Sequence, residues 1–317
     1  MQEGCPCHLA ETNECILCSQ LRGCKFCDCI NWKGVCIYQE YIWNGNKAKE
    51  GRKEFECKII NKTYIEKNLL KLTILIPHKL SSNLVSPGSF VFLRTPDSDQ
   101  FYNTPISIMD LNLEENLIQV AIEIKGIKTK KIDSLNEGEN ILVKGPFWNG
   151  VQGLKNIYKS KDKTSIVVIR GIGQAPSIPV IKKLYSNGNN LIVIVDKGNF
   201  SNIFIREHLE KYNCNVFECQ VFEKGELTDE FKDLLTDLME NREINLIHVA
   251  AQDILIYKIL NYVENPEIKF SCCNNAKMCC GEGICGGCTA RYKGHKIKRL
   301  CKVQTDPRNL FEGRRFI

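Results

Sequence analysis

The sequence lacks any long apolar segment and any recognisable export signal. Nowhere in its 317 residues does a run approach the roughly 18 consecutive apolar residues that suggest a membrane span. The first residues, MQEGCPCHLAETNEC, contain neither a basic start nor an apolar stretch, so they do not resemble a secretory signal peptide. We therefore expect a cytoplasmic protein that does not interact with a membrane.

Catalytic side-chain constellations and nucleic-acid motifs are also missing. No Ser-His-Asp or paired-carboxylate arrangement is recognisable, so we assign no catalytic residue. The formal net charge is only +6, and no aromatic interleaving accompanies the basic residues, so we expect no nucleic-acid partner. Near the C-terminus, Arg291, Lys293, Lys296, Lys298 and Arg299 form a local basic segment, which is either a solvated surface or a docking face for an acidic protein.

Cysteine, in contrast, is abundant and clustered. The chain has 18 cysteines, a number that would indicate disulfides in a small secreted domain but indicates metal or redox chemistry in a chain of this size without an export signal. Eight of them lie between Cys5 and Cys36, and seven between Cys272 and Cys301. The two ends of the chain are therefore the candidate metal-binding regions.

The rest of the chain shows two different hydrophobic patterns. From Phe55, short β-branched or alternating runs such as LLKLTILIP and GSFVFLRT are separated by Pro and Gly, which predicts an antiparallel β-barrel. After a polar linker, KNIYKSKDKT, strands such as TSIVVIR alternate with helical segments, which predicts a Rossmann-like parallel α/β sheet. We expect a multidomain β plus α/β protein with a Cys-rich segment (1–50), a barrel (51–155), an α/β domain (160–265) and a second Cys-rich segment (270–317).

The C-terminal cysteines have the spacing of an iron–sulfur site. Cys280, Cys285 and Cys288 are arranged as C-x4-C-x2-C, and Cys301 follows, which is the plant-type pattern of 2Fe-2S ligands. The glycines between them let the backbone approach closely and direct N–H groups at the sulfurs. Zinc sites usually use C-x2-C pairs, which leaves the glycine-rich step unexplained. We predict a 2Fe-2S cluster on these four cysteines, with Cys279 as the alternative to Cys280.

The order of motifs resembles the electron-transfer subunit of NAD-dependent dihydroorotate dehydrogenase, within the ferredoxin-NADP reductase superfamily. The landmarks span about residues 55–303 and are PGSFVFLR, TPISI, KGIKTKKIDSLNEGENILVKGPFWNG, GIGQAP and the four cysteines. The resemblance implies an FAD-binding barrel, a pyridine-nucleotide-binding sheet, and a cluster that passes electrons to a separate catalytic subunit.

The resemblance also implies where FAD would bind. The implied residues are Thr104, Pro105, Ile106, Ser107, Ala121, Ile122, Glu123, Lys128 and Thr129. Thr104 and Glu123 each stand where the family has an Arg, so two cations beside the diphosphate are lost. Lys125, Lys128 or Arg94 are candidates to compensate. FAD is the expected cofactor, and weak flavin binding, FMN or no flavin are the alternatives.

The implied nucleotide site departs further from the family. Gly171 and Gly173 lie in a strand–glycine turn–helix unit that can place a phosphate at a helix N-terminus. However, Arg170 stands where the family has Gly, near the expected pyrophosphate, and residues 250–252 (Ala-Ala-Gln) replace the Cys-Gly-Pro near the nicotinamide. Asp196, which ends the second strand, is either a ribose ligand or a turn residue. Use of NAD(P)H therefore stays open.

The N-terminal cysteines lie outside the family pattern. The candidate ligands of a second metal site are Cys15, Cys18, Cys24, Cys27, Cys29 and Cys36. The CILC and CKFC pairs suit structural zinc, eight thiols could also hold a 4Fe-4S cluster, and reduced or regulatory thiols are a third reading. Few aliphatic residues are available here for a core, so we expect this segment to need metal to fold.

Together these features predict an electron-transfer flavoprotein subunit. Electrons would pass between a reduced pyridine nucleotide or another two-electron donor, FAD and the 2Fe-2S cluster, and then to a catalytic redox subunit or ferredoxin-like partner in a hetero-oligomer. The alternative is a non-catalytic or redox-sensing module that retains the fold and the cluster but has lost its nucleotide sites.

Overall fold

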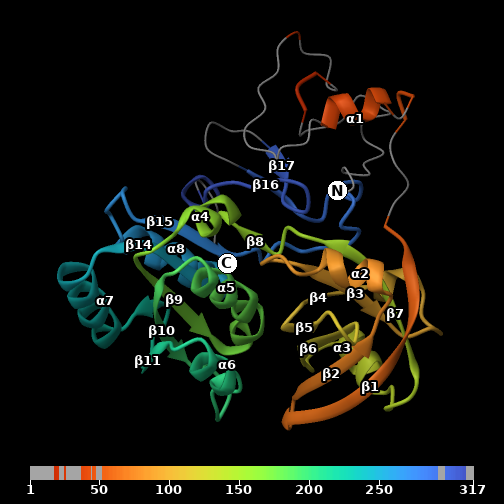
Figure 1. The fold of residues 1–317 in the computed structure, drawn as a ribbon, viewed down its shortest axis with the longest axis horizontal. Coiled ribbons are helices and arrows are strands. Elements are labelled where there is room, and N and C mark those ends of the chain that lie inside the picture. The colour runs from red at the N-terminus through yellow and green to blue at the C-terminus, as the bar shows by residue number, and fades with distance from the viewer. Residues whose placement is uncertain are drawn as a thin grey trace.

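The computed structural model describes residues 18–20, 25, 37–43, 45–47, 52–291 and 297–311. Two sheets lie side by side, one in orange and yellow and the other in green and blue (Figure 1). The short helix α1 (Ile37–Trp43) precedes them in the chain. Among these described residues, no helix combines the length and apolar character needed to cross a bilayer.

The first sheet is antiparallel and curls into the predicted barrel. Its order is β4-β3-β7-β1-β2-β6-β5, and β4 also contacts β6, so the sheet bends back toward itself. Side chains alternate between core and surface, as in β7, where every second residue is buried. The strands are β1 (Glu54–Glu66), β2 (Leu69–Leu75), β3 (Phe90–Arg94), β4 (Thr104–Ser107), β5 (Asp110–Asn112), β6 (Leu117–Glu123) and β7 (Asn140–Phe147), with helices α2 (His78–Asn83) and α3 (Ile127–Asp133) and the 3-10 turn η2 (Gln100–Tyr102) between them.

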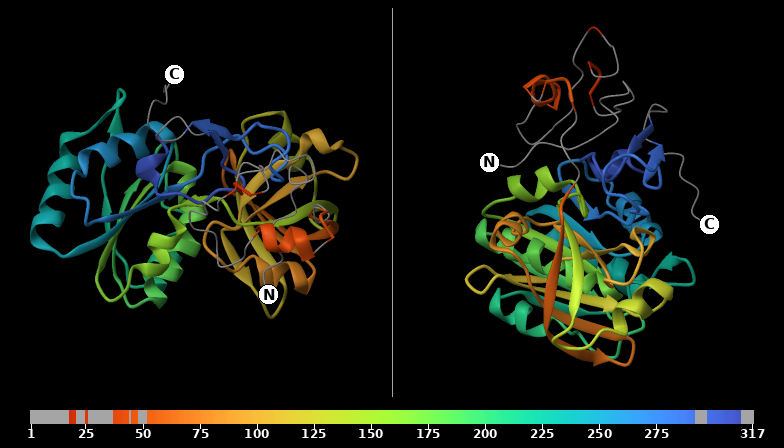
Figure 2. Two further views of the ribbon diagram at one scale, coloured as in Figure 1. Left: turned by 90° about the horizontal axis from the view of Figure 1, so that it is seen from above. Right: turned by 90° about the vertical axis from the view of Figure 1, so that its right-hand side faces the viewer.

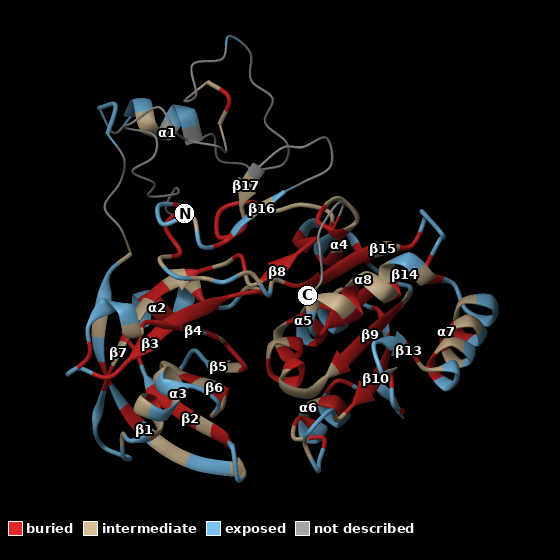
Figure 3. Ribbon diagram, turned by 180° about the vertical axis from the view of Figure 1, so that it is seen from behind, coloured by how far each residue is buried: buried red, intermediate tan, exposed pale blue. Residues whose placement is uncertain are grey.

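The second sheet has the predicted Rossmann-like architecture. Its parallel strands have the order β11-β10-β9-β14-β15, and β8 pairs antiparallel with β15 at the edge. Their near-continuous apolar residues are buried because helices α4, α5 and α6 pack on one face and α7 and α8 on the other (Figure 3). The elements are β8 (Val151–Gln152), β9 (Thr164–Arg170), α5 (Gln174–Ser186), β10 (Asn190–Asp196), α6 (Arg206–Lys211), β11 (Asn215–Glu218), the hairpin β12 (Phe222–Glu223) and β13 (Glu226–Leu227), α7 (Asp229–Asn241), β14 (Ile244–Ala250), α8 (Asp253–Tyr262) and β15 (Lys269–Cys273).

The order of these strands determines where a ligand can bind. The chain runs outward from β9 to β10 and β11, then returns to the other side of β9 to form β14 and β15. The topological switch point therefore lies between β9 and β14. In open α/β sheets the crevice outside the carboxyl ends of the strands at this point is the usual ligand site.

The segment predicted as a polar linker is partly helical. Its first half lies in α4 (Leu154–Lys159). Leu154 and Ile157, three residues apart, are buried in the core on one face of the second sheet. Ile157 is the one apolar residue of the segment in that core, and Leu154 lies just before the segment, so the sequence of the segment looks polar although part of it is helical.

The C-terminal segment is packed into the molecule rather than forming a tail. It contains the hairpin β16 (Thr289–Arg291) and β17 (Ile297–Arg299) and the turn η5 (Pro307–Asn309), and it passes across the junction of the two sheets (Figure 2). Leu300, Cys301 and Val303 belong to the core beside α7 and α8. The amide of Gln152 in β8 donates to the carbonyl of Val303 at 3.1 Å. The proposed domain boundary between residues 155 and 160 stays a prediction. Strand β8 lies before this boundary in the chain but pairs with β15 of the second sheet.

Candidate functional site

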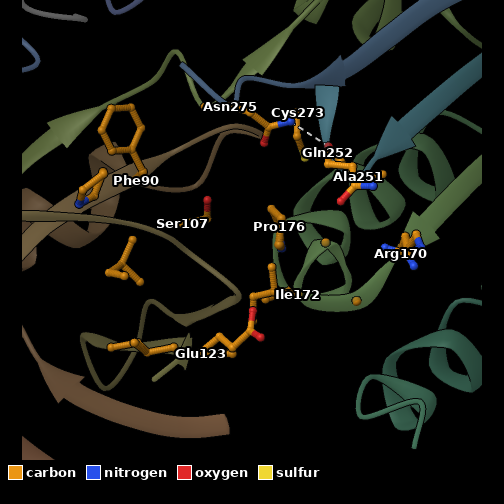
Figure 4. A pocket seen from close by; sticks show the side chains of 18 of the residues that line it. Phe90, Ser107, Glu123, Arg170, Ile172, Pro176, Ala251, Gln252, Cys273 and Asn275 are labelled. Atoms are coloured by element: carbon orange, nitrogen blue, oxygen red, sulfur yellow. Dashed lines mark hydrogen bonds between the residues drawn. The ribbon is translucent and has the colours of Figure 1, made fainter. Parts of the chain in front are cut away.

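A cavity of about 760 Å³ lies between the barrel and the switch point of the second sheet. Figure 4 shows Ser107 of the barrel on one side, and Ile172 of the β9–α5 turn and Pro176 of α5 on the other. The predicted site residues that line it are Thr104, Pro105, Ile106, Ser107, Ala121, Ile122, Glu123, Thr129, Gly171 and Gly173. Segments that lie far apart in the sequence thus meet around one space large enough for a cofactor.

Lys128, predicted beside them, is not part of this wall. Its ammonium group donates to the carbonyl of Asn103 at 3.3 Å and lies 4.8 Å from the ring centre of Phe101. Its neighbour Thr129 caps the start of α3, because its hydroxyl oxygen accepts from the backbone N–H groups of Lys125 at 3.0 Å and Gly126 at 3.2 Å.

The two positions where arginines are missing have local partners of their own. The Thr104 hydroxyl donates to the carbonyl of Tyr102 at 2.9 Å. The Glu123 carboxylate pairs with the Lys125 ammonium at 2.9 Å, and Lys125 also lines the cavity. Arg94 is engaged elsewhere, with Glu54 at 2.5 Å and with the carbonyl of Ser98. Of the three cations considered as replacements, Lys125 alone reaches this wall.

On the opposite wall, the turn from Gly171 to Gly173 packs tightly against strand β14. A Cβ atom on Gly173 would lie 2.0 Å from the carbonyl oxygen of Ala250, so α5 can begin at this point only with glycine there. Gly171 has a φ of +57°, a conformation that glycine adopts readily. This is the geometry that brings a helix N-terminus close to a bound phosphate.

Arg170 is held beside this turn rather than across it. Its Nε donates to the Asp196 carboxylate at 3.0 Å. The same carboxylate accepts from the backbone N–H of Gly198 at 2.8 Å and of Val221 at 3.1 Å. Asp196 therefore acts as a turn residue in this structure, and the Arg170 side chain lies away from Ile172 and Pro176 (Figure 4).

Sequence reasoning missed the third wall of the cavity, which the loop after β15 supplies. Cys273, Asn275 and Met278 line the space. The amide of Asn275 donates to the carbonyl of Ala251 at 2.6 Å (Figure 4). Burial raises the pKa of the Cys273 thiol to about 12, so this thiol stays protonated at neutral pH. The available signal is the position of this loop just before the cluster motif.

An aromatic layer joins the cavity to the cysteine loop. Phe90 lines the cavity and stacks on Phe147 with ring centres 5.1 Å apart. Phe92 meets Phe147 edge-on at 5.0 Å. On the far side, a Cβ atom on Gly281 would lie 2.4 Å from the Phe147 ring. The glycine that follows Cys280 thus lies directly against a ring that stacks on the cavity wall.

The four predicted cluster cysteines lie together as two interacting pairs. Cys280 interacts with Cys285, and Cys288 with Cys301. The hydrogen bond from Cys301 lowers the pKa of Cys288 to about 6, while the same contact raises the pKa of Cys301. Burial acts to raise the pKa of Cys280, but backbone N–H groups around its sulfur bring it below the usual value. Cys280, rather than Cys279, makes these contacts.

Backbone N–H groups point at the sulfurs as the glycines predicted. The N–H of Glu282 lies 3.3 Å from the sulfur of Cys280, and the N–H of Gly287 lies 3.4 Å from the sulfur of Cys285. The N–H of Cys301 lies 3.5 Å from the sulfur of Cys288. Such donors favour the thiolate form that binds iron.

The pairing of these thiols tests which metal group they fit. Within the described residues, no three His, Cys, Asp or Glu side chains surround one point closely enough to hold a single ion. A 2Fe-2S cluster takes two ligands on each of two irons, and two adjacent pairs suit that demand. The donor set therefore fits a 2Fe-2S cluster.

Three cations contact the cluster loop, and sequence reasoning connected neither Arg52 nor Lys302 with it. Arg52 and Lys302 pair with the Glu282 carboxylate at 2.6 Å and 3.4 Å. Burial acts to raise the pKa of Glu282, but these two cations outweigh it and keep the pKa below its usual value. Arg299 donates to the backbone carbonyls of Gly283 and Ile284. Arg299, placed in the predicted docking face, thus belongs to the loop.

Two other predictions fall mostly outside the described residues. Of the N-terminal candidate ligands, Cys18 is described and is half-buried, whereas Cys15, Cys24, Cys27, Cys29 and Cys36 lie outside those ranges. Lys293 and Lys296 of the basic segment also lie outside them. The second metal site and the docking face stay predictions.

Comparisons with known proteins find relatives in the family that the order of motifs predicts. No family model matches the chain. The electron transfer subunit of dihydroorotate dehydrogenase B (NAD(+)) from Clostridium acetobutylicum is 27% identical over 225 residues, covering 69% of this chain and 82% of the relative. The same subunit from Fusobacterium nucleatum is 26% identical, covering 75% and 90%. The solved NADH-dependent reduced ferredoxin-NADP oxidoreductase includes a chain with a TM-score of 0.65 and 22% identity, covering 79% of this chain and 86% of that one. These matches confirm the predicted resemblance and fold.

Proposed function

We propose that this chain is the electron-transfer subunit of an oxidoreductase, with FAD in the cavity and a 2Fe-2S cluster on Cys280, Cys285, Cys288 and Cys301. One observation carries the proposal. The cavity formed by the flavin-type and nucleotide-type segments is joined to two pairs of thiols through Phe90 and Phe147. A site for a two-electron carrier and a site for a one-electron carrier thus share one wall.

The barrel side of the cavity would hold the flavin. Ser107 offers a hydroxyl there, and Phe90, Ile106 and Ala121 supply apolar wall, a combination suited to the edge and face of an isoalloxazine ring. Lys125 is the cation available for the diphosphate, although Glu123 shares its charge. We therefore expect binding that is weaker than a site with two arginines would give.

The sheet side would hold the electron donor. The glycine turn leads into α5, whose first N–H groups suit a phosphate. Next to it, Gln252 and Asn275 form a polar corner of the cavity. We propose a reduced pyridine nucleotide as the donor on this basis.

The bound groups would supply the redox chemistry, with the flavin accepting an electron pair and the cluster carrying single electrons. The side chains described above would bind and orient these groups and exclude water from them. Phe90, Phe92 and Phe147 form a buried layer that keeps water out of the space between the two sites. The names of the relatives suggest that the acceptor is a separate catalytic subunit, so we propose a hetero-oligomer.

An absorbance spectrum of the anaerobically purified protein tests the function. We expect flavin and iron–sulfur bands, iron and sulfide in equal amounts, and bleaching of both chromophores on addition of NADH. A protein with the cluster but no flavin, even after incubation with FAD or FMN, would instead match the redox-sensing alternative. Bands that bleach with dithionite but not with NADH or NADPH would require a different donor.

A further inference from the structure

The ion triad of Arg52, Glu282 and Lys302 is unusual because its members are almost fully buried. The side chains are 9%, 6% and 3% exposed. Both cations contact the same carboxylate oxygen, at 2.6 Å for Arg52 and 3.4 Å for Lys302. Burying three charges is costly, and replacing such groups with apolar residues often leaves a fold equally stable. Stability alone therefore does not explain the triad.

Its position relates it to the cluster loop. Glu282 lies two residues after Cys280, and its backbone N–H points at the Cys280 sulfur. The flanking glycines, Gly281 and Gly283, have φ values of +69° and +79°, so the loop turns sharply on both sides of the carboxylate. Lys302 follows the ligand Cys301 directly in the chain. Two of the three charges thus lie within two residues of a predicted ligand in the chain.

Arg52 comes from a distant part of the chain and fastens the loop to the barrel. Its backbone N–H donates to the other oxygen of Glu282 at 3.0 Å, and its Nε donates to the carbonyl of Pro146 at 2.9 Å. Its guanidinium also lies 5.0 Å from the ring centre of Phe147. With its backbone N–H, Nε and Nη1 all engaged, the guanidinium charge would stay in place when the loop holds the cluster.

The triad has two cations and one anion, so it carries one net positive charge. A cluster held by four thiolates is anionic, and it gains a further negative charge on reduction. Net charge and exposure near such a cluster determine its reduction potential, and charges act more strongly on one another where water is excluded.

We propose that the Arg52–Glu282–Lys302 triad sets the reduction potential of the cluster by stabilising its reduced form. This inference rests on the proposed cluster. It makes the three residues positioning residues, since none of them is a ligand. It also predicts the sign of each change, because the cations and the anion act in opposite directions.

The test is the midpoint potential, followed by EPR during a redox titration of the intact protein. Removing a cation with Arg52→Gln or Lys302→Gln should lower the potential, and Glu282→Gln should raise it. The double variant Glu282→Gln, Lys302→Gln keeps the net charge and should return the potential toward the original value. Lys258→Gln removes a cation from a surface pair with Glu226 and should leave the potential unchanged.

Iron and sulfide content, measured first, separate the possible failures. An original protein without a cluster would overturn the proposed function. With the cluster present, shifts of the same sign in all three single variants, or no shift, would overturn the role of the triad. If one single variant loses its iron, the double variant supplies the measurement instead. The proposal would be contradicted if the potential of the double variant differed from that of the original protein as much as the potential of a remaining single variant does.

Discussion

The cluster loop and the cavity share a wall but are built by different means. The loop would hold the proposed cluster through four cysteine side chains, namely Cys280, Cys285, Cys288 and Cys301. The cavity is assembled from many short segments between Phe90 and Met278. A site made of a few ligands should be lost in one step, whereas a site made of many weak contacts should weaken gradually. The predictions below test this difference.

The largest effect is expected from the cluster ligands. Cys285→Ser and Cys288→Ser should each abolish iron binding, because the hydroxyl is a poor substitute for a thiolate. The two variants should differ in the stability of their cluster-free forms, because Cys285 is exposed and Cys288 is buried in the core. A hydroxyl is more strongly hydrated than a thiol and costs more to bury, so only Cys288→Ser should lower the unfolding midpoint.

Iron analysis and chemical denaturation of the two variants check this. Cys279→Ser is the matched control and should retain its iron. Full iron retention in both ligand variants would show that the cluster lies elsewhere, and loss of iron in the control would make Cys279 a ligand.

The second effect concerns the glycine turn of the cavity. Gly173→Ala would put a Cβ atom 2.0 Å from the carbonyl oxygen of Ala250, so the helix or the central strand must shift. Overpacking of this kind costs about 1–3 kcal/mol or more, and the displaced α5 should also bind NADH less tightly. Gly126→Ala, where nothing lies within 4 Å, serves as the control. Equal stability of the two variants in urea would contradict the close packing.

The third effect should be a gain rather than a loss. Thr104→Arg places a cation in the cavity wall where the family has one, and a hydrogen bond to a charged group contributes about 1.5–3 kcal/mol. Flavin affinity should therefore rise about tenfold or more, as measured by fluorescence titration. Ser186→Arg adds the same charge at the far end of α5 and should not change affinity. No gain at Thr104 would mean that the diphosphate does not lie beside it.

The smallest effect is expected at the basic segment. Lys293→Glu and Lys296→Glu should slow association with an acidic redox partner and reduce the dependence of the rate on salt, since steering by surface charge is screened. Arg299 is left unchanged because it holds the loop. The measurement is the association rate by stopped flow across ionic strengths. Unchanged rates would mean that the basic segment is a solvated surface and not a docking face.

The parts of the molecule that could be predicted are those where chemistry restricts the residue type. Iron ligation requires cysteine at defined spacings, and buried parallel strands require runs such as TSIVVIR, so the cluster residues and β9 were recognisable. Pro105 to Ser107 and Gly173 were recognisable through the family motifs. These signals are local, within about twenty residues of chain.

What could not be predicted depends on contacts between distant residues. Arg52 and Glu282 are separated by 230 positions, and nothing near either one indicates the other. The same holds for Asn275, which completes the cavity from beyond β15. Helix α4 was missed because two buried side chains, Leu154 and Ile157, suffice to fix it when they meet an existing core.

The contact between Gly281 and Phe147 has a consequence for how the two redox sites communicate. Since a glycine lies directly on the ring, and that ring stacks on Phe90 at the cavity, the separation of the sites is set by the thickness of packed rings in a rigid core. Protein cores are dense and change little with motion at the surface. In the proposed function, electrons would cross this layer at a nearly constant tunnelling distance, and changes in loops elsewhere should not alter the internal transfer rate.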